Sequence, residues 1–137
     1  MAPTRCMIVE DQALIGMSLE ASLEDAGFVV EGPFMSKAQA LSWLENDTPD
    51  IALLDVMIKD GTSVEIARAL KSRGVPFAVY SGLPRNADGP SELRNVPWLE
   101  KPVSRETLAS TLEELVARPS CWAAGRESSS SQSPGTP

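Results

Sequence analysis

Short apolar runs alternate with helical stretches along most of this chain, and this alternation restricts the possible folds more than any other feature. The run from Ile51 to Leu54 is apolar throughout, which is typical of a strand buried on both faces of a parallel sheet. Between such runs, apolar residues recur with the spacing of one helix face. The pattern predicts strands at 6–9, 28–30, 51–54, 75–80 and 96–99. It predicts one helix over about 12–26 and further helices that begin at residue 36, at residue 62 or 63, and at residue 104.

The order strand then helix, repeated five times, predicts an α/β fold with three layers. In such a fold, helices cover both faces of a doubly wound, five-stranded parallel sheet. Pro84, Gly89 and Pro90 interrupt the fourth unit, so we expect a short or irregular fourth helix. Residues 1–118 form the expected single domain, and the Ser/Pro/Gly-rich residues 119–137 are expected to form a disordered C-terminal tail.

The composition excludes several classes of function. The chain has no histidine and a net charge of −7. The missing histidine excludes Ser–His and Cys–His nucleophile pairs and His-ligated zinc. The negative charge argues against surfaces for nucleic acids or anionic membranes, so we expect no DNA-binding domain and no membrane partner. Cys6 lies in an apolar run and is expected to be a reduced core residue, which suits a cytoplasmic protein.

Polar residues follow the expected strands at the end where parallel sheets bind ligands. Glu10 and Asp11 follow the first strand, Asp55 the third, Ser81 the fourth and Lys101 the fifth. Three crowded carboxylates need a cation, and oxygen ligands favour Mg²⁺ or Mn²⁺. A lysine and a hydroxyl can hold phosphoryl oxygens, and one carboxylate can act as the nucleophile. The pattern therefore predicts phosphoryl transfer at this edge of the sheet.

These markers, in this order, resemble a CheY-like receiver domain of a two-component response regulator, over about residues 4–117. The resemblance implies a flavodoxin/CheY-like sheet of order 2-1-3-4-5. It further implies that Asp55 accepts a phosphoryl group from a histidine kinase or a histidine phosphotransfer protein. The chain would then be a stand-alone bacterial regulator that catalyses only its own phosphorylation and dephosphorylation. It would switch binding to an unidentified downstream protein or relay the phosphoryl group.

The resemblance also assigns the metal ligands. In receivers, an acidic pair after the first strand and the phospho-acceptor hold Mg²⁺, and these positions fall on Glu10, Asp11 and Asp55. The backbone carbonyl of Met57 would be a further ligand. The cation is thus expected to share the phospho-acceptor with the transferred group.

The remaining roles concern the phosphoryl oxygens and the switch. By resemblance, Lys101 and Ser81 hold the phosphoryl oxygens, the N–H of Gly82 contributes, and the Lys101–Pro102 peptide is cis. The phosphoryl group would draw Ser81 inward and let the switch aromatic, Trp98, move in behind it. An aromatic in a fifth strand often simply packs, so a packing role for Trp98 stays open.

Two features depart from the usual receiver pattern. Segments 76–82 and 97–102 resemble the alphaproteobacterial FATGUY subset of stand-alone receivers, but Tyr80 and Ser81 stand in place of Ala-Thr before Gly82. Receivers usually signal through the fourth helix, the fifth strand and the last helix. The irregular fourth unit puts that route in question here.

Other functions are compatible with parts of the pattern. A receiver-like module could bind a partner without phosphorylation, although intact Asp55 and Lys101 argue against this. An Asp-nucleophile phosphatase would usually carry an acid two residues after the nucleophile, where this chain has Met57. A dinucleotide-binding protein would need a Gly-rich loop after the first strand, and the sequence there lacks one. Other residues are interpreted as structural: Lys59 and Asp60 as solvated loop charges, and Trp43 and Trp122 as packing residues.

Overall fold

The computed structural model describes residues 3–83 and 90–117 of the chain. The elements follow in the order β1 (Arg5–Val9), α1 (Ala13–Asp25), β2 (Val29–Phe34), α2 (Lys37–Leu44), β3 (Ile51–Leu54), β4 (Met57–Ile58), β5 (Gly61–Thr62), α3 (Val64–Ser72), β6 (Phe77–Ser81), a 3₁₀ turn (Ser91–Leu93), β7 (Trp98–Glu100) and α4 (Arg105–Ala117). The predicted tail 119–137, with Trp122, and residues 84–89 of the irregular segment lie outside the described residues.

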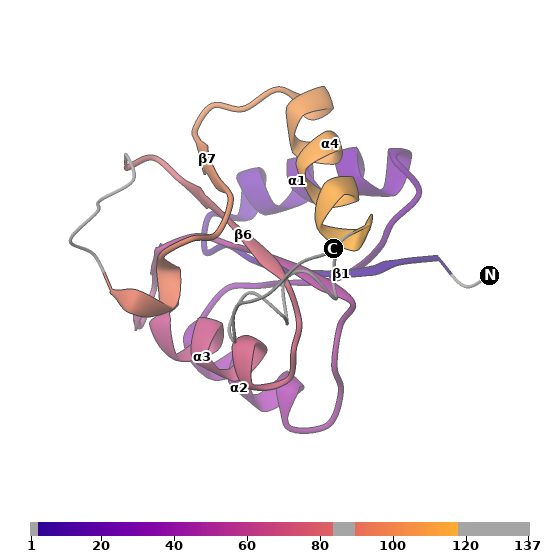
Figure 1. Ribbon diagram of the computed structural model, residues 1–137. Coiled ribbons are helices and arrows are strands. Elements are labelled where there is room, and N and C mark those ends of the chain that lie inside the picture. The colour runs from indigo at the N-terminus through magenta and orange to yellow at the C-terminus, as the bar shows by residue number, and fades with distance from the viewer. Residues whose placement is uncertain (1–2, 84–89, 118–137) are drawn as a thin grey trace.

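The main sheet has the predicted topology. Within the described residues, its five parallel strands lie in the order β2-β1-β3-β6-β7. Because β6 and β7 are the fourth and fifth strands of this sheet along the chain, the predicted order 2-1-3-4-5 is confirmed. Figure 1 shows α1 and α4 on one face of the sheet and α2 and α3 on the other. The fold is therefore the predicted three-layer α/β fold.

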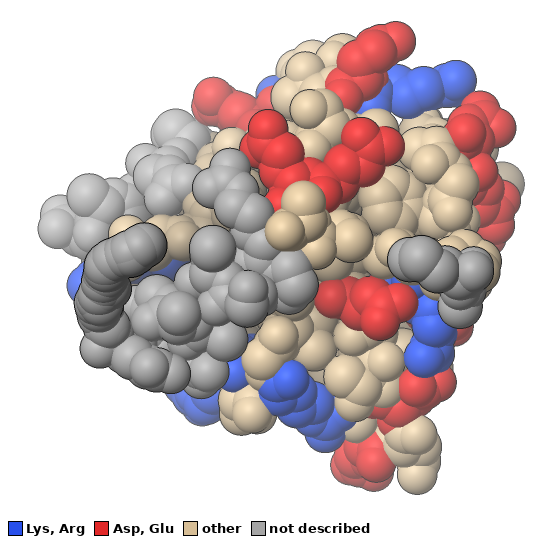
Figure 2. All heavy atoms as spheres, turned by 45° about the vertical axis from the view of Figure 1, so that its right-hand side comes forward, with Lys and Arg blue, Asp and Glu red and all other residues tan. Residues whose placement is uncertain are grey.

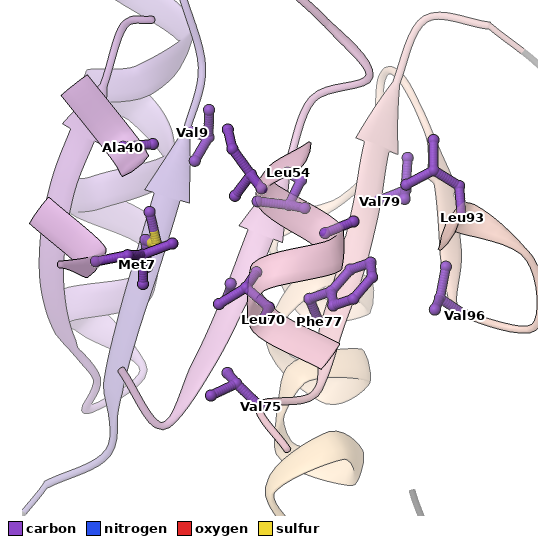
Figure 3. Packing of buried hydrophobic residues seen from close by; sticks show 14 of the residues in the cluster. Met7, Val9, Ala40, Leu54, Leu70, Val75, Phe77, Val79, Leu93 and Val96 are labelled. Atoms are coloured by element: carbon purple, nitrogen blue, oxygen red, sulfur yellow. The ribbon is translucent and has the colours of Figure 1, made fainter. Parts of the chain in front are cut away.

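Two apolar cores join the sheet to its helix layers. The core beneath α2 and α3 contains Met7, Leu54 and Phe77, which point into a common space in Figure 3. The core beneath α1 and α4 contains Ile8 and Leu53. Successive residues over 6–9 of β1 and throughout β3 thus enter opposite cores and are all buried. This arrangement explains why these strands are apolar throughout.

Serine side chains cap two of the helices, whereas Ser63, the N-cap residue of α3, makes no such bond. The hydroxyl of Ser36 accepts from the N–H of Gln39 at 3.1 Å at the start of α2. The hydroxyl of Ser104 accepts from the N–H of Thr107 at 3.1 Å at the start of α4. Each bond pairs one of the N–H groups that the first turn of a helix cannot pair itself.

β2 is longer than predicted, and the expected end at residue 30 is wrong. The strand continues through a Gly-Pro pair to Phe34, and the peptide that follows Gly32 is cis. Pairing with β1 shifts register between Met7 and Val9, so the strand pairs again beyond the irregularity. Gly32 has a φ of 100°, and a Cβ there would lie 2.7 Å from the N of Phe34. This glycine makes a bulge within the strand rather than an end.

Two further segments refine the predictions. β6 begins at Phe77 and includes Ser81 as its last residue, whereas the predicted strand ends one residue earlier. In the described part of the irregular fourth unit, Ser91–Leu93 forms a 3₁₀ turn, as a short or irregular helix predicts. Leu93 is buried in the core beneath α2 and α3 and fixes this turn to the domain.

Charged side chains are spread over the surface. Figure 2 shows Asp and Glu interspersed with Lys and Arg on one face. Among the described residues, no helix has the length and apolar character needed to cross a membrane.

Candidate functional site

Four of the predicted site residues meet at the carboxyl edge of the sheet. Glu10 directly follows β1 and Asp55 directly follows β3, Ser81 is the last residue of β6, and Lys101 directly follows β7. Backbone hydrogen bonds fix their positions, because the N–H of Asp55 donates to Val9 at 3.0 Å and the N–H of Lys101 donates to Ser81 at 2.8 Å. The parallel pairing of these strands therefore brings the predicted residues together.

The Lys101 ammonium joins two buried carboxylates. Its Nζ lies 3.0 Å from Oδ2 of Asp55 and 3.1 Å from Oε1 of Glu10. Burial would lower the pKa of Lys101, but the hydrogen bonds to these two carboxylates outweigh it and raise the pKa. The predicted cis peptide between Lys101 and Pro102 is present.

Glu10 is almost completely enclosed. Its side chain is 1% exposed, and its second oxygen accepts from the N–H of Gln12 at 3.1 Å. Burial raises the pKa of Glu10, against the opposing hydrogen bonds from Gln12 and Lys101. The backbone N–H of Glu10 donates to Phe34 at 2.9 Å, so the far end of β2 helps to hold this residue in place.

Three carboxylates gather on the same side of the site. One oxygen from each of Glu10, Asp11 and Asp55 lies within 4.8 Å of the others. Asp11 is half-buried and Asp55 is 9% exposed. Like charges at this separation repel each other, and Lys101 contacts only two of the three directly. The group therefore forms a concentrated negative site that a cation can stabilise.

The predicted switch residues are connected through one loop residue. The buried hydroxyl of Ser81 accepts from the N–H of Leu83 at 3.0 Å. The indole Nε1 of Trp98 donates to the carbonyl of Leu83 at 2.9 Å. Trp98 is half-buried and also packs against the core beneath α2 and α3. Ser81 and Trp98 are thus linked by the backbone of Leu83.

The other two predicted residues lie on loops at the same edge. Met57 is the first residue of the short β4–β5 hairpin that follows Asp55, and its side chain is 54% exposed. Gly82 follows Ser81 and is exposed. A Cβ on Gly82 would meet nothing within 4 Å, so open space adjoins this residue.

Two contacts near the site are not anticipated by the sequence. The Nζ of Lys101 lies over the ring of Tyr80, 5.1 Å from its centroid. Asp60, interpreted from the sequence as a solvated loop charge, accepts from the backbone N–H groups of Lys37 at 2.6 Å and Ala38 at 3.1 Å. Asp60 is therefore exposed but bonded, and it joins the β4–β5 hairpin to the start of α2. Neither contact has a signal in sequence spacing, because each depends on how separate elements pack.

Comparisons with known proteins agree with this geometry. The chain matches the family described as response regulator receiver domain over residues 6–113. It is 30% identical over 130 residues to Response regulator MprA of Mycobacterium sp. (strain KMS), covering 86% of this chain and 53% of the relative. It is 26% identical over 119 residues to Transcriptional regulatory protein PdtaR of Mycobacterium tuberculosis, covering 85% and 58%. The chain spans about half the length of these curated relatives.

Solved structures share the fold. A CheY-like response regulator receiver domain protein from Methanospirillum hungatei JF-1 superposes with a TM-score of 0.76 at 23% identity, covering 88% of this chain and 98% of that one. The signal receiver domain of a modulated diguanylate cyclase from Desulfovibrio desulfuricans G20 gives a TM-score of 0.76 at 27% identity, with the same coverage. With the family match across most of the described residues, the chain belongs to the response regulator receiver domain family.

Proposed function

We propose that Asp55 accepts a phosphoryl group from a histidine of another protein, a histidine kinase or a histidine phosphotransfer protein. The observation that carries this proposal is the contact between Lys101 Nζ and Asp55 Oδ2 at 3.0 Å, at the edge of the sheet where ligands bind. The ammonium is placed to stabilise negative charge on a group attached to that oxygen. The chain itself has no histidine, so the donor histidine belongs to the partner.

The proposed reaction is a direct transfer. An oxygen of the Asp55 carboxylate attacks phosphorus, a new O–P bond forms, and the N–P bond to the donor imidazole breaks. The bonding electron pair returns to the imidazole nitrogen, which can then take up a proton. Water later cleaves the acyl phosphate, restoring Asp55 and releasing inorganic phosphate. The chain therefore catalyses only its own phosphorylation and dephosphorylation.

The donor set fits Mg²⁺, or Mn²⁺ in its place. These cations prefer oxygen ligands, carboxylates among them, and Glu10, Asp11 and Asp55 offer three oxygens within 4.8 Å of one another. We assign these side chains and the backbone carbonyl of Met57 as ligands. The cation would neutralise charge on the phosphoryl oxygens. Lys101 supplies positive charge from the protein itself.

Ser81, Gly82 and Trp98 complete the proposed site. The hydroxyl of Ser81 and the N–H of Gly82 lie at the end of β6, where they could donate to phosphoryl oxygens. The hydroxyl of Ser81 accepts from the N–H of Leu83 and keeps its own hydrogen to donate, so movement of this hydroxyl toward the phosphoryl group would shift the backbone of Leu83 as well. Because Trp98 is bonded to the carbonyl of Leu83, this change is expected to move the indole.

Exposed apolar side chains support a protein partner. Leu14, Met57 and Leu83 are 81%, 54% and 53% exposed. They lie beyond the ends of β1, β3 and β6, at the edge that carries the site. Apolar side chains gathered around a polar site are typical of a surface that docks another protein. We propose that this takes place in the bacterial cytoplasm, in keeping with a free, buried Cys6.

Phosphorylation of the full chain by a small acyl phosphate tests the proposal. Intact mass and a phosphate-affinity gel would follow labelling of the parent protein with and without Mg²⁺. Asp50→Asn is the matched control, because Asp50 precedes β3 at the opposite edge of the sheet and accepts from the N–H of Arg5 at 2.8 Å. We expect labelling of the parent and of Asp50→Asn, no labelling of Asp55→Asn, and dependence on Mg²⁺.

Other outcomes separate the alternatives. Equal labelling of Asp55→Asn would contradict the assignment of Asp55. If the chain does not label, and a partner binds it equally well with and without beryllofluoride, the chain would be a phosphorylation-independent binding module. Repeated turnover of a small phosphate ester would indicate a phosphatase.

A further inference from the structure

Tyr80 is an aromatic residue that the proposed reaction does not use. It belongs to β6, pairs in register with Leu99 of β7, and is 9% exposed. Its side chain lies in the core beneath α1 and α4. The ring therefore occupies a fixed position one residue before Ser81, next to the site rather than within its polar group.

The ring contacts the ammonium on which the proposed reaction depends. Nζ of Lys101 lies over the Tyr80 ring, 5.1 Å from its centroid, which is within the range of a cation–π interaction. The same Nζ lies 3.0 Å from Asp55 and 3.1 Å from Glu10, and the lysine side chain is 19% exposed. Two carboxylates and one ring thus confine the ammonium.

Tyr80 differs from the two carboxylates in one respect. Glu10 and Asp55 belong to the set proposed to hold Mg²⁺, and a bound cation weakens their attraction for the ammonium. The ring of Tyr80 is not part of this set and is held in the core. A bound cation therefore weakens the ring's attraction for the ammonium less than it weakens the attraction of the two carboxylates. A lysine is a point charge on a flexible stem, and its effect on a transferring group depends on where the charge is held.

We propose that Tyr80 is a positioning residue whose ring holds the Lys101 ammonium beside Asp55 while the phosphoryl group is transferred. This inference rests on the proposed function and extends it to a side chain outside the polar site. Phenylalanine at this position preserves the ring, whereas leucine replaces it with a smaller aliphatic side chain. The two substitutions therefore separate the ring from its hydroxyl.

The first test is a rate measurement on the full chain. The rate constant for phosphorylation by acetyl phosphate in saturating Mg²⁺ would be measured for the parent, Tyr80→Phe and Tyr80→Leu. We expect Tyr80→Phe to remain within about twofold of the parent and Tyr80→Leu to be about 2- to 30-fold slower, the range of a cation–π interaction. Phe28→Leu is the matched control, because Phe28 is 7% exposed in the same core and its substitution is expected to lower stability but not this rate.

The second test reads the contact without phosphorylation. Ring currents should shift the ε-CH₂ proton resonances of Lys101 upfield in the parent and in Tyr80→Phe, and the shift should disappear in Tyr80→Leu. Lys101→Met would assign the resonance. Unshifted ε-CH₂ protons in the parent would overturn the proposal even if Tyr80→Leu proves too unstable to purify.

The rate outcomes are equally decisive. A folded Tyr80→Leu that reacts as fast as Tyr80→Phe would overturn the proposal, as would Tyr80→Phe slowed as much as Tyr80→Leu. If the parent does not react but its Lys101 ε-CH₂ protons are shifted upfield as expected, the result would instead contradict the proposed function. The positioning contact would then exist without the reaction.

Discussion

The indole of Trp98 donates to the carbonyl of Leu83 at 2.9 Å, and the N–H of the same Leu83 donates to the hydroxyl of Ser81. A change at the Ser81 hydroxyl is therefore expected to reach the indole through the backbone of one residue, Leu83. The connection is short, because it uses only the N–H and the carbonyl of Leu83. It gives the predicted switch a specific physical route.

Beryllofluoride should change the fluorescence of Trp98 in a manner that depends on Ser81. The measurement uses a background with Trp43→Phe and Trp122→Phe, which leaves Trp98 as the reporter. We expect a Mg²⁺-dependent change in this background, retention of the change in Ser81→Thr, and loss of most of it in Ser81→Ala. The reason is that threonine preserves the hydroxyl that would donate to an oxygen of the ligand while accepting from the N–H of Leu83. An unchanged response in Ser81→Ala would show that Trp98 responds by another route.

Removing one acidic charge should have opposite effects with and without Mg²⁺. In Asp11→Asn, repulsion from Glu10 and Asp55 is relieved, so the metal-free protein should gain up to about 1 kcal/mol in free energy of unfolding. The stabilisation by added Mg²⁺ should shrink, because the affinity for the cation should fall by about tenfold or more. Urea unfolding with and without MgCl₂ measures both quantities.

A matched substitution controls for loss of surface charge. Glu45→Gln removes an exposed carboxylate at the end of α2. Glu45 precedes the amino end of β3, whereas Asp55 follows its carboxyl end, so the substitution should leave the Mg²⁺-dependent stabilisation unchanged. Equal Mg²⁺ stabilisation of Asp11→Asn and the parent would contradict the assignment of Asp11 as a ligand.

The buried thiol of Cys6 should make the protein less stable at alkaline pH. Burial raises the pKa of Cys6 from 9.0 to about 12, so above pH 9 the unfolded chain loses a proton that the folded chain retains. The contribution to the free energy of unfolding is thus complete below pH 9 and falls by about 1.4 kcal/mol per pH unit up to pH 12. Unfolding of the parent and Cys6→Ala, both with Cys121→Ser, would be compared from pH 8 to 11. Parallel pH dependences would show that the thiol ionises equally in both states.

Sequence pattern determines the sheet and most of the site for one physical reason. Asp55 and Lys101 each follow an apolar strand, and parallel pairing brings such strand ends to one edge whatever the details of packing. The bulge at Gly32 is different, because glycine and proline usually end strands, and continuation to Phe34 depends on the pairing with β1. The contact between Tyr80 and Lys101 depends on the relative placement of β6 and the loop after β7. Such contacts follow from tertiary packing, which residue spacing does not encode.

The bonds from Asp60 to the start of α2 have a consequence for protein engineering. This carboxylate pairs with two N–H groups of a helix that lies 22 and 23 residues earlier in the chain. The hydrogen bond from the backbone N–H of Lys37 favours the ionised carboxylate and lowers the pKa of Asp60. A chimera that replaces the hairpin after Asp55 with one from another receiver, but keeps the native α2, would lose this cap. Residues 36–38 and 57–62 therefore form one unit of exchange, although the rest of α2 and all of β3 separate them in the sequence.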